Sequence, residues 1–439
     1  MALIFVPATW ALPVGGVVTA GGASIANGLG ATTVAQSSQN AAIDWQGFSI
    51  GQGEVVRFVQ PNASAVALNR VVGSDVSSIL GRLSANGQVF LINPNGIVFG
   101  AGAQVNVGGL VASTLNVSDS DLTQATRHFS GGATGAIVNR GTITAQRGGY
   151  VALLANRVSN QGTINAPAGS VALGAASAVA LSFDNNRLLS MQVDQGAVNA
   201  LVENKQLIVA ESGQVLMSAT AKDKLLASVV NNSGVIQANG VSTDGGVVRL
   251  LASGGNVTAS GTIDVSGVHG GSVQLLSDRD VLLTGLARID ASGAQGGGQV
   301  RIGGGAQGGE GLPRAERTYM ADGATVNADA TSQGNGGTVV VWSDTNTVVA
   351  GSLSARGGAT GGAGGWVETS SHGGLAMSRA PVVAAAFGAP GTWLIDPYDI
   401  NIVAGSGATN INNANPFAAT GNTASLGVGL ITTALTNGA

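Results

Sequence analysis

A repeated motif constrains the fold of this chain more than any other feature of its sequence. Two glycines followed by alternating apolar positions, Gly-Gly-x-Val-x-apolar, recur through the second half of the chain. The first glycines of the five copies, the last of them weaker, are Gly245, Gly270, Gly297, Gly336 and Gly364. Their spacing gives a unit of about 26 residues, with one interval longer by about a dozen, and a fixed period of this length indicates a repeat architecture.

A second motif, Gly-x-apolar-x-Ala or Val, lies between these copies and extends the repeat toward the start of the chain. Its copies begin at Gly141, Gly162, Gly234, Gly261 and Gly351, with a glycine-less variant at Ala287. Each unit therefore holds short strands with alternating apolar positions, broken by Gly, Asn and Ser at corners. One coil would bury roughly four to six side chains at about 1.5–3 kcal/mol each, against about 1–2 kcal/mol per residue for ordering.

Because a single coil is not stable, the coils must stack on one another and share one interior, and both ends need caps. The sequence therefore predicts an all-β fold, a right-handed parallel β-helix. Composition agrees: 70 of 439 residues are glycine, 44% are hydrophobic and 10% are charged, which favours one long core and little helix. A net charge of -4 argues against nucleic-acid binding, and the absence of cysteine excludes disulfides and thiolate metal sites.

The two ends of the chain carry separate expectations. Residues 1–11 form a short apolar run that ends in Ala11, a residue suited to cleavage before Leu12, while the first basic residue is Arg57. We therefore expect residues 1–11 to be the remnant of a signal peptide whose charged start is missing, with an apolar first strand as the alternative. Residues 391–439 end in a strand-and-turn pattern without a capping element, so we expect this segment to continue beyond the sequence given.

Three asparagines and one irregular interval stand out within the repeat. Asn139, Asn160 and Asn232 each lie two positions before a motif glycine, which predicts corner residues that hydrogen-bond along the stack. The interval 182–228 breaks the pattern. We interpret it as irregular coils within the stack, with residues 195–203 and 221–228 as short helix candidates.

A long stretch near the start of the chain carries a family resemblance. It includes Phe48-Ser-Ile-Gly-Gln-Gly-Glu-Val-Val-Arg57, then Val66-Ala-Leu-Asn69-Arg70-Val71, then Gly87-Gln-Val-Phe-Leu-Ile-Asn93-Pro-Asn-Gly-Ile97-Val-Phe-Gly100. This stretch resembles the haemagglutination-activity domain of the filamentous haemagglutinin family, whose members use two-partner secretion. The resemblance is close over about residues 12–130, and residues 391–400 resemble a segment common in such exoproteins.

The resemblance implies domains, a function and partners. It implies an N-terminal capping secretion domain over residues 12–240 and a β-helical shaft over residues 241–390. It also implies a secreted adhesin that crosses the periplasm of a Gram-negative bacterium. A dedicated outer-membrane barrel with POTRA domains would recognise the N-terminal domain and deliver the protein to the cell surface. A host-cell receptor or glycan is a further expected partner, and no catalysis and no cofactor are implied.

The candidates for transporter recognition are Asn69, Arg70, Asn93, Pro94, Asn95, Gly96 and Ile97. Asn93 to Ile97 matches one hallmark of the family, whereas a second hallmark, Asn-Pro-Asn-Leu, is absent and Asn69 with Arg70 stands in its general region. Physically, residues 93–96 have turn chemistry, with proline fixing φ at the second position and glycine closing the turn. The turn could serve folding alone, or shape the transporter-binding surface, or both.

A β-helical polysaccharide-active enzyme, a lyase or a glycoside hydrolase, is the alternative function. Asp264 and Asp290 occupy equivalent motif positions and could form paired carboxylates, although a solvent-facing ladder is favoured. His128, His269 and His372 have no metal-ligand spacing, so we predict no metal. The glycine-rich residues 303–309 lack a phosphate-loop lysine and predict a flexible loop. Trp342, Trp366 and Trp393 could form a sugar-stacking patch, but packing is favoured. We predict that the chain is not an enzyme.

Overall fold

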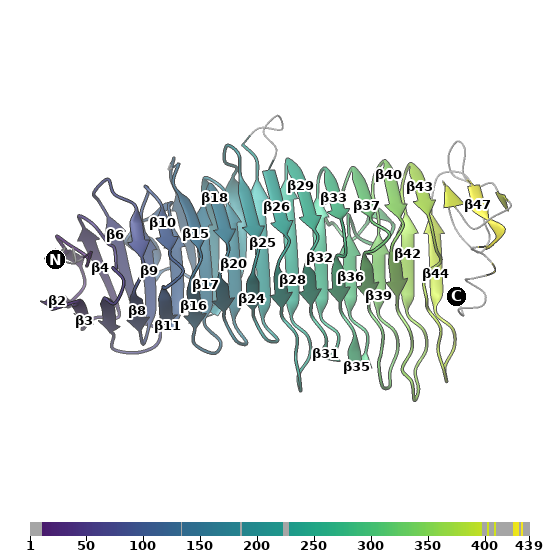
Figure 1. The fold of residues 1–439 in the computed structure, drawn as a ribbon, viewed down its shortest axis with the longest axis horizontal. Coiled ribbons are helices and arrows are strands. Elements are labelled where there is room, and N and C mark those ends of the chain that lie inside the picture. The colour runs from purple at the N-terminus through teal and green to yellow at the C-terminus, as the bar shows by residue number, and fades with distance from the viewer. Residues whose placement is uncertain are drawn as a thin grey trace, which may run out of the picture.

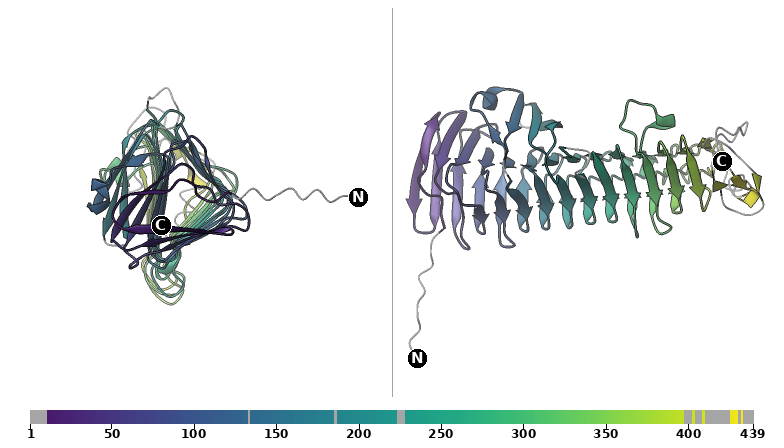
Figure 2. Two further views of the ribbon diagram at one scale, coloured as in Figure 1. Left: turned by 90° about the vertical axis from the view of Figure 1, so that its left-hand side faces the viewer. Right: turned by 90° about the horizontal axis from the view of Figure 1, so that it is seen from above.

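The fold is a single elongated column of stacked coils (Figure 1). The computed structural model describes residues 11–132, 134–184, 187–222, 228–396, 402–403, 408–409, 425–429 and 432. Each regular coil contributes one strand to each of three long sheets, and the view along the axis has a roughly triangular outline (Figure 2). Strands of successive coils pair in parallel, which confirms the predicted parallel β-helix.

Sheet 1 has 14 strands. In order along the column they are β1 (Val17–Ala20), β4 (Asn40–Trp45), β6 (Val66–Val71), β9 (Gln88–Ile92), β12 (Gly109–Ser113), β17 (Tyr150–Ala155), β20 (Ser170–Ala175), β25 (Gln214–Thr220), β28 (Val247–Ser253), β32 (Ser272–Ser277), β36 (Gln299–Ile302), β39 (Thr338–Val341), β42 (Trp366–Ser370) and β44 (Thr392–Asp396).

Sheet 2 also has 14 strands. They are β7 (Ser77–Ile79), β10 (Ile97–Phe99), β15 (Ala136–Asn139), β18 (Arg157–Asn160), β23 (Leu201–Asn204), β26 (Ser228–Asn232), β29 (Gly255–Ala259), β33 (Asp280–Leu283), β37 (Arg317–Met320), β40 (Asn346–Val349), β43 (Gly374–Met377), β46 (Ala408–Thr409), β47 (Ser425–Gly427) and β45 (Ile402–Val403).

Sheet 3 has 13 strands. They are β2 (Ala23–Gly28), β3 (Ala31–Gln36), β5 (Val55–Val59), β8 (Arg82–Ala85), β11 (Gln104–Val107), β16 (Thr142–Ala145), β19 (Thr163–Asn165), β24 (Leu207–Val209), β27 (Val235–Gln237), β30 (Thr262–Asp264), β34 (Arg288–Asp290), β38 (Thr325–Asn327) and β41 (Ser352–Ser354). On one edge of the column, loops between sheets 3 and 1 lengthen in the second half, where β31 (Gly267–His269) pairs with β35 (Gly293–Gly296) (Figure 1).

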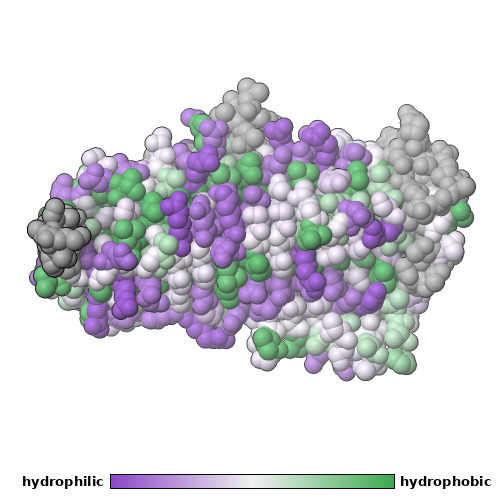
Figure 3. All heavy atoms as spheres, in the orientation of Figure 1, coloured by the Kyte–Doolittle hydropathy of each residue, from purple (hydrophilic) through white to green (hydrophobic). Residues whose placement is uncertain are grey.

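One hydrophobic core runs through the column from Val34 to Ile395. The central apolar residue of the second motif forms a row along sheet 3, each member in register with the next: Ile143, Ile164, Ile208, Ile236, Ile263, Ile289, Val326 and Leu353. These side chains are buried. On the face seen in Figure 3, hydrophilic and weakly polar residues cover most of the column and hydrophobic residues occur in small groups. The stack thus provides the shared interior that no coil has alone.

The two glycines of the first motif are required because coils approach closely on both sides of each pair. A Cβ on Gly270 would lie 1.9 Å from the Ala291 carbonyl oxygen of the following coil. A Cβ on Gly271 would lie 2.1 Å from the Gly246 carbonyl oxygen of the preceding coil. Neither position has room for a side chain. The repeat seen in the sequence is therefore a packing requirement of the stack.

A fourth sheet lies outside the column, against the outer face of sheet 1 (Figure 2). Its strands are β13 (Asn116–Val117), β14 (Thr126–Ser130), β21 (Ala178–Asp184) and β22 (Arg187–Gln195), and the 3-10 helix η1 (Ser120–Thr123) joins the first two. A second hydrophobic cluster fills the space beneath it. Within that cluster the Arg127 guanidinium lies 5.2 Å from the Phe90 ring centroid and 4.6 Å from that of Phe183.

The interpretation of residues 182–228 as irregular coils was wrong. The chain first leaves the column as the hairpin β21–β22 and then returns as β23, β24 and β25, which pair in register with their neighbours. The helix candidate 195–203 is also wrong, because its second part is strand β23. Most of the candidate 221–228 lies outside the described residues. The regular coil was missed because Gln206 stands where the second motif has glycine, and Ser212 stands where the first motif has the first of its two glycines.

A strap, defined as residues 303–316, contains the insertion of about a dozen residues in the repeat. It contains the 3-10 helix η2 (Ala306–Gly308), and a Cβ on Gly308 would lie 2.6 Å from the Trp342 ring. The Gln307 backbone N–H donates to both carboxylate oxygens of Glu368 at 2.9 and 3.1 Å. The prediction of a flexible loop for residues 303–309 was therefore wrong, since these contacts hold the segment against the outer face of sheet 1.

Stability is expected to fall as the pH rises from about 5 to about 7, because burial raises the pKa of Glu368 to about 7. The folded chain then binds a proton that the unfolded chain has released, so the free energy of unfolding decreases across this window. Urea unfolding of Glu368→Gln should lose this decrease, whereas the exposed control Glu211→Gln should keep it. An unchanged pH dependence in Glu368→Gln would contradict the assignment.

The ends of the column differ from its middle. At the N-terminal end β1 pairs antiparallel with β4, and β2 pairs antiparallel with β3, so the first residues fold back over the stack. The column continues across residue 240, where β27 pairs with β30, and the division into secretion domain and shaft at this residue stays a prediction.

The predicted signal-peptide remnant, apart from Ala11, and most of residues 397–439 lie outside the described residues. No helix among the described residues has the length and apolar character needed to cross a bilayer.

Candidate transporter-recognition site

The predicted recognition residues lie on two adjacent coils near the N-terminal end. Asn69 and Arg70 are in β6, and the turn of residues 93–96 connects β9 to β10. The register of sheet 1 places Arg70 opposite Ile92, immediately before the turn. The fold therefore brings the two groups of candidates side by side, although they are more than 20 residues apart in the sequence.

Asn93 holds the turn from inside and has no exposed surface. Its amide nitrogen donates to the Asp75 carbonyl oxygen and to Ser77 Oγ, both at 2.9 Å. Its Oδ1 accepts from the backbone N–H of Asn95 at 2.9 Å and from the Asn95 amide at 3.0 Å. All four contacts lie within the protein. The Asn93 side chain is thus part of the packing between two coils.

The other residues of the turn divide between the interior and the surface. Gly96 has a φ of +119°, which favours glycine, and its N–H donates to the Asn93 carbonyl oxygen at 3.1 Å. Asn95 donates to the Gly73 carbonyl oxygen at 2.9 Å, and Ile97 is fully buried in the core. Pro94 is exposed. Of the five predicted turn residues, Pro94 presents the most surface to a partner.

Asn69 is also fully buried and points into the column. Its Oδ1 accepts from the indole N–H of Trp45 at 3.0 Å. Its amide donates to the carbonyl oxygens of Ala67 at 3.1 Å and Phe90 at 3.3 Å. This side chain joins three coils at the N-terminal end, and its contacts are those of a structural residue.

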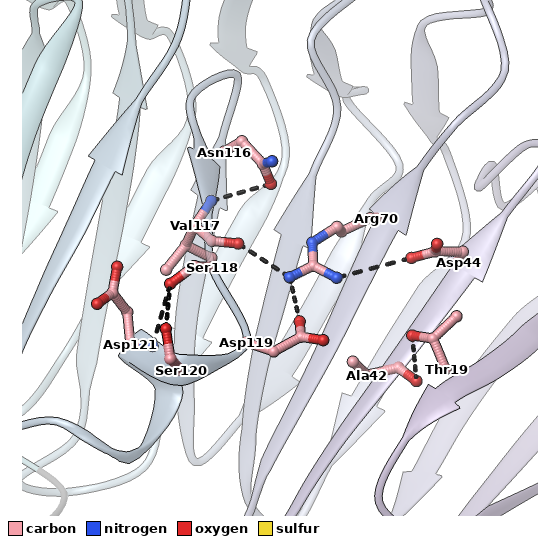
Figure 4. Close-up of polar contacts among 10 residues, drawn as sticks. All are labelled: Thr19, Ala42, Asp44, Arg70, Asn116, Val117, Ser118, Asp119, Ser120 and Asp121. Carbon is pink, nitrogen blue, oxygen red and sulfur yellow. Dashed lines mark hydrogen bonds and ion pairs between the residues drawn. The ribbon is translucent and has the colours of Figure 1, made fainter.

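Arg70 lies on the outer face of sheet 1 and joins the column to the fourth sheet (Figure 4). Its guanidinium donates to the Val117 carbonyl oxygen at 2.9 Å and forms an ion pair with Asp119. On the other side Asp44 Oδ1 lies 3.8 Å from its Nη1. The side chain is 18% exposed, so the position is partly screened from solvent. Arg70 thereby fixes the segment between β13 and η1 over the first coils.

Two exposed valines next to the turn were missed by the sequence reasoning. Val72 is 55% exposed and precedes Gly73, whose carbonyl accepts from Asn95. Val76 is 44% exposed and lies between Asp75 and Ser77, which both accept from Asn93. Val72, Val76 and Pro94 are grouped under the name turn surface, because each is exposed and each is next in the chain to a residue that is hydrogen-bonded within this turn. One indication of an exposed valine at this place was present in the sequence, the pair Val71-Val72. Because consecutive residues of a strand face opposite sides, one of two adjacent valines must point outward.

The corner asparagines form a continuous hydrogen-bonded ladder. The Asn139 amide donates to Asn160 Oδ1, Asn160 to Asn204, and Asn204 to Asn232, each at 2.8 Å. All four are fully buried. Asn204 was missed because Gln206 stands where the motif has glycine. The ladder lies inside the column and is built for stability.

Replacing Asn160 by alanine is expected to lower the free energy of unfolding by about 1–3 kcal/mol, because it leaves buried groups of Asn139 and Asn204 without partners. The matched control is Asn165→Ala, since Asn165 faces outward on β19. Urea unfolding measures both variants. Equal losses in the two would show that the ladder contributes nothing beyond the coil itself.

The residues weighed for the enzyme alternative serve local structure. Asp264 and Asp290 are in register on β30 and β34, and each accepts a backbone N–H two residues on, at 2.9 and 3.1 Å. Trp342 and Trp393 are 1% and 5% exposed, and Trp366 is half-buried, so they form no open stacking patch. Within the described ranges no group of three His, Cys, Asp or Glu residues could hold a metal ion.

Comparisons with known proteins agree with this architecture. The family model described as the TPS secretion domain matches residues 12–265. A heme/hemopexin-binding protein of Haemophilus influenzae is 34% identical over 266 residues, covering 58% of this chain and 29% of the relative. The filamentous hemagglutinin of Bordetella pertussis is 26% identical over 265 residues, covering 54% of this chain and 7% of the relative. The chain thus spans less than a third of the length of these relatives.

A solved structure gives the same result for the fold. The HMW1 secretion domain from Haemophilus influenzae matches with a TM-score of 0.76 and 32% identity, covering 88% of this chain and all of that chain. The family model alone covers more than half of the present sequence. On this evidence, the chain belongs to the family of TPS (two-partner secretion) secretion domain proteins.

Proposed function

We propose that this chain is part of a secreted adhesin-class exoprotein, which crosses the periplasm of a Gram-negative bacterium and is exported by a dedicated outer-membrane barrel with POTRA domains. The observation that carries the proposal is the match of the TPS secretion domain to residues 12–265 of an unbroken β-helix. The exported protein is displayed at the cell surface, where it binds a host-cell receptor or glycan.

The physical basis of export is the order in which coils can form. No ATP is available outside the inner membrane, so outward movement must be driven by an event on the far side. Each emerging coil packs against the one before it, and nearly all strand pairs join neighbouring coils. Folding can therefore propagate coil by coil, and the apolar surface buried at each step biases movement outward.

The turn surface, Val72, Val76 and Pro94, is the proposed contact for the POTRA domains. The half-buried Asn95 and the buried candidates position this surface, and Arg70 holds the fourth sheet beside it. The buried candidates are Asn69, Asn93, Gly96 and Ile97. Exposed apolar side chains next to a rigid turn offer binding energy without a need for ordering. The asparagines thus contribute to recognition by holding the turn in shape, and the exposed residues that flank them contact the POTRA domains.

A binding measurement tests this contact. The variant Val72→Ser/Val76→Ser is expected to weaken binding to the purified POTRA domains of the cognate barrel by about tenfold, a loss of about 1.4 kcal/mol. Val241→Ser is the matched control, because Val241 is 99% exposed and lies far along the shaft. Calorimetric titration gives both affinities. Unchanged affinity in the double variant, with its stability intact, would place the contact elsewhere.

A further inference from the structure

A buried carboxylate lies at the N-terminal end of the column. Glu54 closes the tight turn that precedes β5, with its backbone N–H donating to the Gly51 carbonyl oxygen at 3.0 Å. The residue is 2% exposed. One carboxylate oxygen, Oε2, accepts from the Gly51 N–H at 2.6 Å. The local turn therefore engages one of the two oxygens and leaves the other for a partner from elsewhere.

That partner is the start of the chain. Glu54 Oε1 accepts from the backbone N–H of Ala11 at 2.9 Å, across 43 residues of sequence. The residues that follow Ala11 are anchored to the column: Leu12 packs on the core, Pro13 is buried, and the Val14 N–H donates to the Gly47 carbonyl oxygen at 2.9 Å. Residues 11–14 thus cover the end of the stack, and Glu54 marks where they reach it.

Charge distinguishes this contact from an ordinary hydrogen bond. A buried carboxylate is stable as an anion only when a positive group or several strong donors compensate it. Glu54 accepts from two neutral amides, and among the described residues no Lys, Arg or His side chain forms an ion pair with it. A cation that carries N–H donors would supply the positive charge that the two neutral amides lack.

We propose that Glu54 binds the α-ammonium group of the mature amino terminus, created at Leu12 when the leader is removed after Ala11; this rests on the proposed export and on the cleavage before Leu12 that the sequence predicts. Hydrolysis by the exporting cell's leader peptidase adds one water across the peptide bond. The carboxylate stays on Ala11, and the new amine on Leu12 takes up a proton. The Leu12 nitrogen is only one residue, about 3.8 Å of chain, from the Ala11 nitrogen. A small shift of the Glu54 side chain therefore lets its carboxylate accept from the new amine while Leu12, Pro13 and Val14 keep their anchors.

This arrangement couples leader removal to closure of the N-terminal end. Before cleavage, the carboxylate meets a neutral amide. After cleavage it meets a full positive charge with three donors, and charge-assisted hydrogen bonds are roughly twice as strong as neutral ones. The end cap therefore reaches its full stability only in the processed protein, after the leader has been left behind.

The first test compares the purified mature chain beginning at Leu12 with the same chain carrying a Gly-Ser extension before Leu12. The extension is expected to lower the urea midpoint of the chain with Glu54, and to have little effect in Glu54→Gln, because the pair acts as a unit. Equal midpoints for the free and extended chains with Glu54 intact would overturn the proposal, and this comparison needs no Glu54 variant to fold. N-terminal sequencing of the secreted protein that finds a start at any residue other than Leu12 would also overturn it.

A second readout reports the charge directly. The carboxylate should raise the pKa of the Leu12 α-amine, because it stabilises the charged form, and so lower the rate of acylation near neutral pH by about tenfold. The exposed control Glu211→Gln should acylate as slowly as the parent chain, and Glu54→Gln about tenfold faster. Equal rates in Glu54→Gln and the parent would contradict the assignment. Neither readout depends on the barrel, so failure here is distinguishable from failure of the proposed export.

Discussion

Replacing Gly298 by alanine is expected to lower the free energy of unfolding by more than about 4 kcal/mol, which places it among the most severe single substitutions. The added Cβ would lie 2.2 Å from the Gly271 carbonyl oxygen and 2.6 Å from the Gly270 carbonyl carbon. Both atoms belong to the backbone of the preceding coil and cannot move without opening the stack. Circular dichroism during urea unfolding measures the loss.

The matched control for this substitution is Gly132→Ala. A Cβ on Gly132 would have no atom within 4 Å, so the variant should be nearly as stable as the parent. The comparison separates close approach of coils from the general effect of replacing glycine. If Gly298→Ala were no less stable than Gly132→Ala, close packing between coils would not be the reason why the motif has two glycines.

Replacing Asn93 by alanine is expected to lower the free energy of unfolding by about 2–4 kcal/mol, because four internal hydrogen bonds are lost and buried donors and acceptors stay unpaired. Asn62→Ala is the control, since Asn62 is also an asparagine in a turn but is exposed. Thermal and urea unfolding give the two values. Losses of equal size in the two variants would show that the internal contacts of Asn93 are not important for stability.

The burial of Asn93 also affects how export experiments are interpreted. A variant of Asn93 that is poorly secreted could fail because the turn is deformed, because the chain is unstable, or because the transporter no longer binds. Substitutions in the turn surface avoid this ambiguity, since Val72, Val76 and Pro94 are exposed. We therefore expect Pro94→Ser to change stability little while the turn keeps its backbone hydrogen bond.

Much of the column could be predicted from the sequence because its packing rule is local and repeated. The double glycine predicted sheet 1 of each coil, and the Gly-x-apolar-x-Ala motif predicted sheet 3, where Ile143 and Ile164 are in register. Asn139 and Asn160 could be placed on one ladder since both precede a motif glycine by two positions. Each of these inferences needs only the neighbouring coil.

The remaining features depend on contacts that no local pattern shows. The hairpin β21–β22 folds back on the outside of the column, where its burial comes from Phe90 and Tyr150, both distant in sequence. Residues 195–203 have helix-forming composition, but pairing of β23 with β18 decides their structure. The residues of the turn at Asn93 would be suitable for a buried turn and for an exposed one. Whether Asn93 is buried depends on the position of the preceding coil, which the turn sequence does not show.

Export of the chain with and without its barrel is the most direct test of the central claim, that a β-helical secretion domain directs this protein through a two-partner route. The full chain behind a functional signal peptide is expressed in cells that carry or lack the cognate POTRA-containing barrel, and the protein in the medium is quantified. The account predicts secretion only with the barrel and periplasmic retention without it. Equal amounts in the medium in both cases would contradict it.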